Sequence, residues 1–178
     1  LNWHFPLSVM EEVSRHPALP DPLRRRFALA AWTRALVLKQ PAVAQRIAPE
    51  LLKLAPETGP VFQAYLDAPT PQERSNAALF VLLKFPSLTP SIQIGVPEFN
   101  TVEANDYYLE SAWWCAPSDT EYNLQGAEVR KIVAKPVFLT SAQLEAARRE
   151  RAALVTIGDA KSYLGKQTIA WAKSFPED

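Results

Sequence analysis

Residues 70–85 have the sequence TPQERSNAALFVLLKF, which defines a helix from its first turn to its last. Thr70 and Glu73 form a capping box, because the hydroxyl accepts from the N–H of Glu73 and the carboxylate accepts from the N–H of Thr70. Pro71 suits the first helical position, where no N–H is needed. The run 77–83 is apolar nearly all round, which predicts that other helices cover this helix on most sides.

The same start signals recur on both sides of this helix. Proline or a capping residue begins further helical patterns near residues 6, 21, 41, 59, 141 and 159. Pro49 lies inside the pattern that begins at Pro41, and it predicts a kink or a split there. Short links between the patterns favour antiparallel helical hairpins of about 30–40 residues, the size of α-solenoid repeats. We therefore predict a mainly all-α fold of the α-solenoid or tetratricopeptide-like kind.

Residues 87–139 interrupt the helical pattern as a long irregular insertion. Within it, 91–96 alternates like a short strand and 129–139 is rich in β-branched residues, so the two can pair as a short β-hairpin. Pro136 would restrict the second strand to an edge. One amphipathic turn or helix within 119–134 stays open as an alternative.

The insertion divides the sequence into three parts that we expect to form one domain. They are an N-terminal helical region, an aromatic-rich insertion and a C-terminal helical hairpin, at residues 1–86, 87–139 and 140–178.

Composition excludes several classes of function. Lys plus Arg and Asp plus Glu both number 19, so no global field attracts nucleic acid. No apolar run approaches the roughly 20 residues of a membrane-spanning helix. A single Cys and two His leave little material for a metal site, and no phosphate loop, haem motif or nucleophile elbow is present. We therefore expect no cofactor and no metal, and we interpret the arginine run 24–26 as a solvated helix face.

Residues 105–117 read NDYYLESAWWCAP and hold two of the five Tyr, two of the five Trp and the only Cys. Aromatic rings can stack on a sugar or peptide while carboxylates orient it. The candidate binding residues are therefore Asp106, Tyr107, Tyr108, Glu110, Trp113 and Trp114. The favoured interpretation is structural: both Trp pack as anchors that touch the helices before and after the insertion. Cys115 is interpreted as a small buried hydrophobe, since His4 and His16, the only imidazoles, are about a hundred residues away.

The C-terminal segment resembles the helix ending of tetratricopeptide-type repeats, with Tyr163-Leu164-Gly165 followed by an alanine shortly before Pro176. Trp113-Trp114-Cys115, Phe138-Leu139-Thr140 and Ala31-Trp32-Thr33-Arg34-Ala35 make the chain similar to a group of larger bacterial proteins. This resemblance implies a helical repeat, export by a signal peptide to the periplasm or beyond, and a polypeptide that continues after Asp178. It implies no activity.

The resulting hypothesis is a non-catalytic helical-repeat segment that binds or scaffolds a protein or peptide partner within a larger exported protein. Self-association through exposed helical ends is a further expectation, because solenoid units bury their faces only against neighbours. The alternative is a hydrolase or polysaccharide-binding domain that uses Asp106, Glu110 and the adjacent rings.

Overall fold

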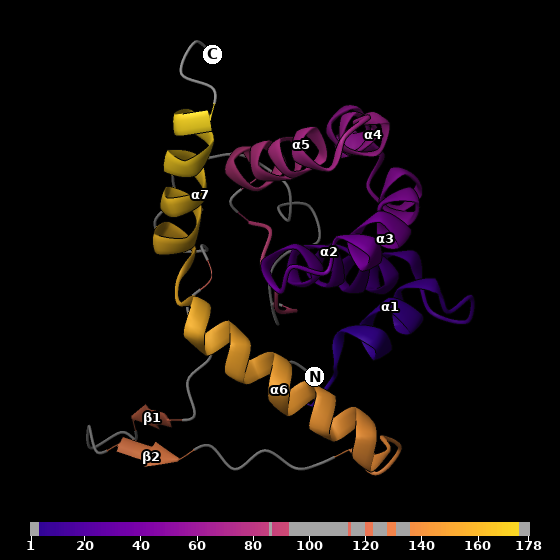
Figure 1. The fold of residues 1–178 in the computed structure, drawn as a ribbon. Coiled ribbons are helices and arrows are strands. Elements are labelled where there is room, and N and C mark those ends of the chain that lie inside the picture. Colours follow the sequence, from indigo (N-terminus) through magenta and orange to yellow (C-terminus); the bar gives the residue numbers. More distant parts are fainter. Residues whose placement is uncertain are drawn as a thin grey trace.

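The computed structural model describes residues 4–85, 87–92, 114, 120–122, 128–130 and 136–174. This part of the chain is predominantly helical, which confirms the all-α class (Figure 1). In chain order the elements are α1 (Leu7–Arg15), α2 (Asp21–Val37), α3 (Pro41–Leu54), the 3₁₀ turn η1 (Pro56–Thr58), α4 (Gly59–Asp67), α5 (Pro71–Lys84), β1 (Thr120–Tyr122), β2 (Glu128–Arg130), α6 (Ser141–Ile157) and α7 (Ala160–Ser174).

Local chemistry accounts for the best-defined helix ends. At α5 the capping box forms as predicted, with both backbone bonds between Thr70 and Glu73 at 3.1 Å. Thr140 and Gln143 form the second box at the start of α6. Gly158 ends α6 at a φ of +89°, a conformation that favours glycine.

Pro49 does not split α3, although the sequence predicts a kink or a split. The helix runs unbroken through this residue. Proline removes one backbone hydrogen bond from the helix interior. Ile47, Ala48 and Leu51 are all fully buried around it, and their packing offsets that loss.

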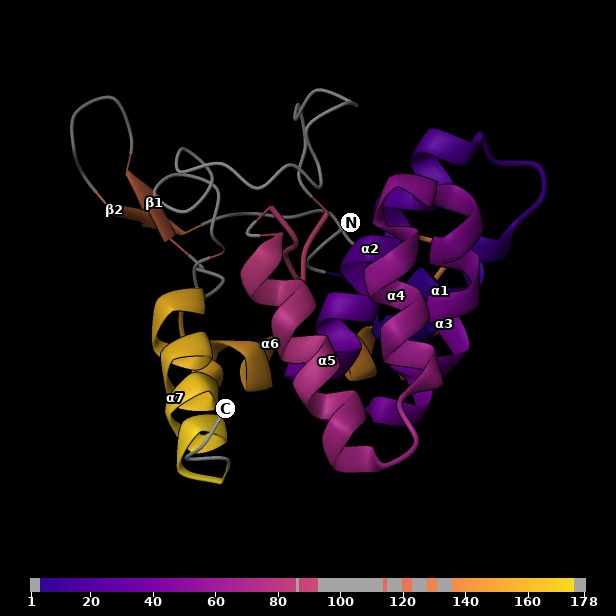
Figure 2. The same cartoon turned by 90° about the horizontal axis from the view of Figure 1, so that it is seen from above.

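The first five helices form one bundle, in which each helix packs against the next in the chain (Figures 1 and 2). The central helix is α2, which is buried almost continuously from Phe27 to Ala35. Trp32 meets Phe62 and Tyr65 of α4 edge to face, with ring centroids 4.8 and 5.4 Å apart. Edge-to-face packing is a favoured arrangement of aromatic rings.

The prediction that α5 is covered on most sides is wrong. Ala78, Val81 and Leu82 are buried, but Phe80 is 55% exposed and Leu83 is 39% exposed. The reason is position, because α5 lies at the edge of the bundle and packs mainly against α4 and α7. The helix that is enclosed on nearly all sides is α2.

Helices α6 and α7 form an arm that returns to the bundle at two places. Helix α6 contacts α1, and α7 contacts α5 (Figure 1). Phe138, just before α6, packs edge-on against Phe5 with centroids 5.9 Å apart. The arm thus joins the two ends of the α1–α5 bundle.

The described strands form one antiparallel pair, and the predicted pairing of 91–96 with 129–139 stays a prediction. β1 and β2 are antiparallel, with Thr120 opposite Arg130 and Glu121 opposite Val129. The predicted partner of Val129 was in the segment 91–96, of which residues 93–96 lie outside the described residues.

The arginine run 24–26 is not a solvated face. All three residues are only partly exposed. Arg24 pairs with Asp21 at 3.0 Å and with Glu50 of α3 at 3.5 Å, while Arg25 pairs with Glu57 of η1. The run therefore ties α2 to its neighbours, a role that helical periodicity alone does not reveal.

Candidate functional site: a groove between α5 and α7

A groove of about 310 Å³ lies between α5 and α7, which run side by side at the edge of the molecule (Figure 2). Residues spaced three or four apart line each wall, because they share one face of a helix. Leu36 of α2 also lines the groove. The side chains that define the walls are Gln72, Ser75, Asn76, Leu79 and Leu82 from α5 and Tyr163, Gln167, Trp171 and Ser174 from α7.

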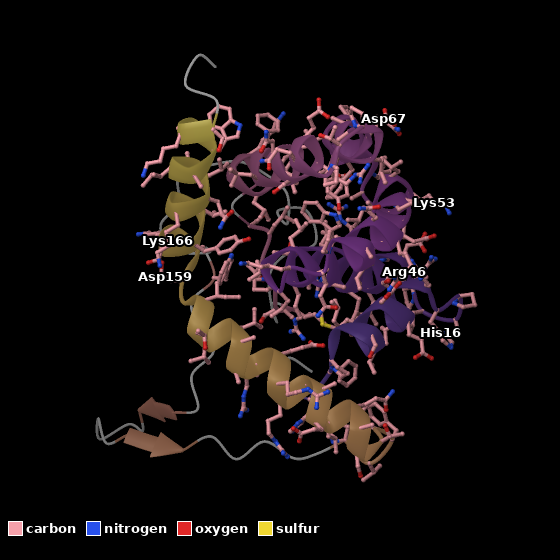
Figure 3. The ribbon with its side chains drawn as sticks, viewed as in Figure 1. His16, Arg46, Lys53, Asp67, Asp159 and Lys166 are labelled. Atoms are coloured by element: carbon pink, nitrogen blue, oxygen red, sulfur yellow. The ribbon has the colours of Figure 1, made fainter. Side chains whose placement is uncertain are left out.

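No residue that lines this groove in the described part of the chain carries a formal charge. Its polar groups are amides and hydroxyls, which both donate and accept hydrogen bonds. On the α5 wall, Gln72 Nε2 donates to Asn76 Oδ1 at 3.1 Å, so these two amides are aligned one turn apart. Gln167 provides a third amide from the α7 wall. The charged side chain of Lys166, by contrast, lies on the face of α7 turned away from the bundle (Figure 3).

Burial raises the pKa of the Tyr163 hydroxyl, so this group stays protonated and uncharged at neutral pH. Its ring lies 6.0 Å from that of Trp114. The carbonyl of Trp114 accepts a 3.1 Å hydrogen bond from the N–H of Ala160, the first residue of α7. Trp114 thus supports the groove from behind rather than lining it.

The groove has exposed apolar side chains on the helices beside it. Phe80 and Leu83 lie on α5 and do not line the groove, and Lys84 Nζ is 5.6 Å from the centre of the Phe80 ring. Apolar surface next to a concave site is typical of surfaces that bind another molecule.

A second chemically unusual place is the pair of the buried Arg34 and the partly buried Glu150, which joins α2 to α6. Arg34 is 2% exposed, and its guanidinium Nη1 lies 3.6 Å from Glu150 Oε2. Burial lowers the pKa of Arg34, and Glu150 opposes that shift. Burial raises the pKa of Glu150, against the hydrogen bond from Leu7 and the charge of Arg34. Such shifts in pKa occur both in functional sites and in structural ion pairs.

Of the predicted binding residues, the structure describes only Trp114. It is 8% exposed and belongs to the hydrophobic core. Its contacts with Tyr163 and Ala160 are those of a packing anchor toward the helices after the insertion. The other predicted residues, and Cys115, lie outside the described residues: Asp106, Tyr107, Tyr108, Glu110 and Trp113.

Two other kinds of site are also not seen where the structure can be described. In that part of the chain, no three His, Cys, Asp or Glu side chains gather as a metal ion would require. None of the described helices is long and apolar enough to cross a membrane.

Sequence reasoning missed both the groove and the ion pair. The groove joins helices that are far apart in the sequence, since Gln72 and Tyr163 are 91 positions apart, and no local pattern predicts that they meet. A signal for Arg34 does exist, since it is a charged residue on the inner stripe of an apolar helix. Glu150 stands in the charged run RRER, where nothing distinguishes it.

Comparison with known proteins identifies no relative of this chain. No protein-family model matches the sequence, and neither a curated protein nor a solved structure matches it.

Proposed function

We propose that this chain is a non-catalytic helical binding module that holds an uncharged, partly apolar peptide segment of a partner protein between α5 and α7. The observation that carries the proposal is the groove itself, whose described lining combines leucine and aromatic surface with amides and hydroxyls but no charge. A peptide backbone needs alternating donors and acceptors, and Gln72, Asn76 and Gln167 supply both.

The affinity would come from the apolar part of the groove. Leu79 and Leu82 stand on one wall and Trp171 on the other. Tryptophan is enriched among the residues that dominate binding energy, because it buries a large surface at a low cost in conformational entropy. An apolar side chain of the peptide would therefore be held between the two walls.

The alternative, a hydrolase or polysaccharide-binding domain, depends on Asp106 and Glu110, which lie outside the described residues. Hydrolysis by a carboxylate pair needs two acidic groups at one site. The described lining of the groove contains none, which favours binding over hydrolysis at this place.

The wider hypothesis, a helical-repeat scaffold within an exported bacterial protein, remains part of the proposal. Its support is that α1 to α5 pack in sequence order, as the units of a solenoid do. Export rests on the resemblance alone. The exposed Phe80 and Leu83 are the surface through which self-association would occur, and sedimentation of the protein across a range of concentrations tests it.

Peptide selection followed by matched substitutions tests the groove. A random peptide library displayed on phage is selected against the whole chain, and the enriched peptides are titrated by calorimetry. Trp171→Ala should weaken binding by about 30-fold or more, the effect of losing an aromatic hot spot of about 2 kcal/mol.

The matched control is Ile169→Ala, which removes an exposed apolar side chain from the same helix outside the groove. It should leave the affinity unchanged. Equal weakening by both variants, or selected peptides that all carry several charges, would contradict the proposal.

A further inference from the structure

The first turn of α1 is capped by a residue far away in the sequence. Pro6 stands at the N-cap position and has no side-chain acceptor, and α1 carries no acidic residue in its first turn. The N–H of Leu7 instead donates to both carboxylate oxygens of Glu150, at 2.9 and 2.8 Å. A helix begins with unpaired N–H groups and a partial positive charge, so a carboxylate satisfies both requirements.

Arg34 binds two backbone carbonyls close to Glu150. Its Nε donates to the carbonyl of Pro90 at 2.8 Å, and its Nη1 donates to the carbonyl of Phe5 at 2.8 Å. The same Nη1 faces Glu150. The planar fork of one guanidinium thus joins α2 to the segment before α1, to the segment after α5 and to α6.

Among the described residues, few side chains of α6 are buried against the bundle. Only Ala147 and Leu154 are buried among its seventeen residues. The edge contact of Phe138 with Phe5 lies at its start. The polar pair is therefore a large share of what fixes this helix against α1.

The position of α6 constrains that of α7, because only Gly158 and Asp159 separate the two helices. Asp159 closes this link tightly, since its carboxylate accepts from the N–H and the hydroxyl of Ser162 at 2.9 and 3.1 Å. In Figure 1 α6 runs from beside α1 to the base of α7, which stands next to α5. A movement of α6 away from α1 would carry α7, one wall of the groove, with it.

We propose that the Arg34–Glu150 pair is a latch that holds the α6–α7 arm against α1 and thereby sets the width of the groove between α5 and α7. Glu150 is a positioning residue, because it does not line the groove. The effect of the latch on ligand affinity rests on the proposed function. Its effect on the arm does not.

The position of the arm can be measured directly as the distance between two spin labels. One label replaces Asp67 on α4 and the other replaces Lys166 on α7, in a Cys115→Ser background. Both side chains are exposed, and Figure 3 shows them on opposite parts of the molecule. Glu150→Ala removes the cap and the ion pair. Glu150→Gln keeps an oxygen that can accept from Leu7 but removes the charge.

The matched control is Glu145→Gln on the same helix. The ion pairs of Glu145 with described residues are local, with Arg148 at 2.6 Å and Arg149 at 3.9 Å, so this variant removes the same charge from α6 at a position away from Arg34. Each variant is checked for wild-type helix content by circular dichroism before the distances are compared.

Glu150→Ala should broaden the Asp67–Lys166 distance distribution toward longer values, Glu150→Gln should do so partly, and Glu145→Gln should not. If the unlatched groove is formed about a tenth of the time, the apparent affinity for a selected peptide falls about tenfold. An unchanged distance distribution in Glu150→Ala overturns the latch, whatever the affinity does. If Glu150→Ala does not fold, Glu150→Gln carries the test, and a wild-type distribution in that variant overturns the latch.

The two proposals fail in distinguishable ways. A shifted distance in a protein whose wild type binds no peptide supports the latch and refutes the peptide groove. A wild-type protein that binds peptide with an unchanged distance in the variants supports the groove and refutes the latch.

Discussion

At the scale of the single residue, the hydroxyl of Tyr65 is a buried polar group without a hydrogen-bond partner in the described part of the chain. The residue is 1% exposed, and its hydroxyl has no hydrogen-bond partner among the described residues. A buried hydroxyl without a partner costs about 1–3 kcal/mol. Tyr65→Phe should therefore leave the free energy of unfolding unchanged or raise it by up to that amount, measured by urea titration. A loss of more than about 1 kcal/mol would show that the hydroxyl has a partner.

Tyr65 also predicts a pH dependence at alkaline pH. Burial raises its pKa to about 12 in the folded state, against about 10 in the unfolded chain. A raised pKa means that the folded state favours the proton. The stability that this provides is complete below pH 10 and is lost as the pH rises toward 12, by about 2–3 kcal/mol in total. The unfolding free energy of the wild type should thus fall relative to Tyr65→Phe over this window, and parallel curves would refute it. Tyr163, whose pKa burial also raises, is common to both proteins.

The contribution of Arg34 to stability should depend on the geometry of its donors and not on its charge alone. Lysine keeps the positive charge but cannot direct donors to the carbonyls of both Phe5 and Pro90. Arg34→Lys should cost about 2–3 kcal/mol in unfolding free energy. Arg46→Lys is the control, since Arg46 is an exposed residue (Figure 3) that pairs with Glu11, and this variant should cost much less than Arg34→Lys. Equal costs would mean that the fork of Arg34 is not required.

At the scale of the element, the capping boxes make comparable and local contributions. Thr70→Ala removes the acceptor for the N–H of Glu73 and should destabilise the protein by about 1 kcal/mol. Thr140→Ala should weaken the start of α6 similarly. Hydrogen exchange should locate each loss in the first turn of the altered helix. Protection lost evenly over the whole chain would contradict the local character of these caps.

Most elements could be predicted because their signals are local. A capping box and Pro71 define the start of α5, and Gly158 defines the end of α6. The extent to which other elements bury a helix could not be predicted from local signals. The apolar run of α5 looks enclosed in the sequence, yet Phe80 is exposed because the helix lies at the edge of the bundle. Pro49 is tolerated because the packing of α3 outweighs one lost hydrogen bond.

At the scale of the whole molecule, contacts between distant segments create both the groove and the latch. Leu7 and Glu150 are 143 positions apart, and no helical period connects them. Only the closure of the α6–α7 arm onto α1 and α5 brings these groups together. The sequence therefore predicts the helices and the class of fold, while the site depends on a topology that local patterns do not contain.

The described lining of the groove is uncharged, and this has a consequence for binding in solution. Binding that depends on apolar contacts and neutral hydrogen bonds is little affected by ionic screening. The dissociation constant of a selected peptide should change by less than about twofold between 0.05 and 0.5 M NaCl, measured by calorimetry. A tenfold weakening in high salt would indicate that charged residues outside the groove hold the ligand.

The most direct test of the central claim, that the α5–α7 groove is a peptide site, is a heteronuclear NMR titration of the labelled chain with a selected uncharged peptide. The side-chain amide signals of Gln72, Asn76 and Gln167 and the indole signal of Trp171 should shift together, with one dissociation constant. Shifts confined to other surfaces, with these four signals unmoved while the peptide binds, would contradict the account.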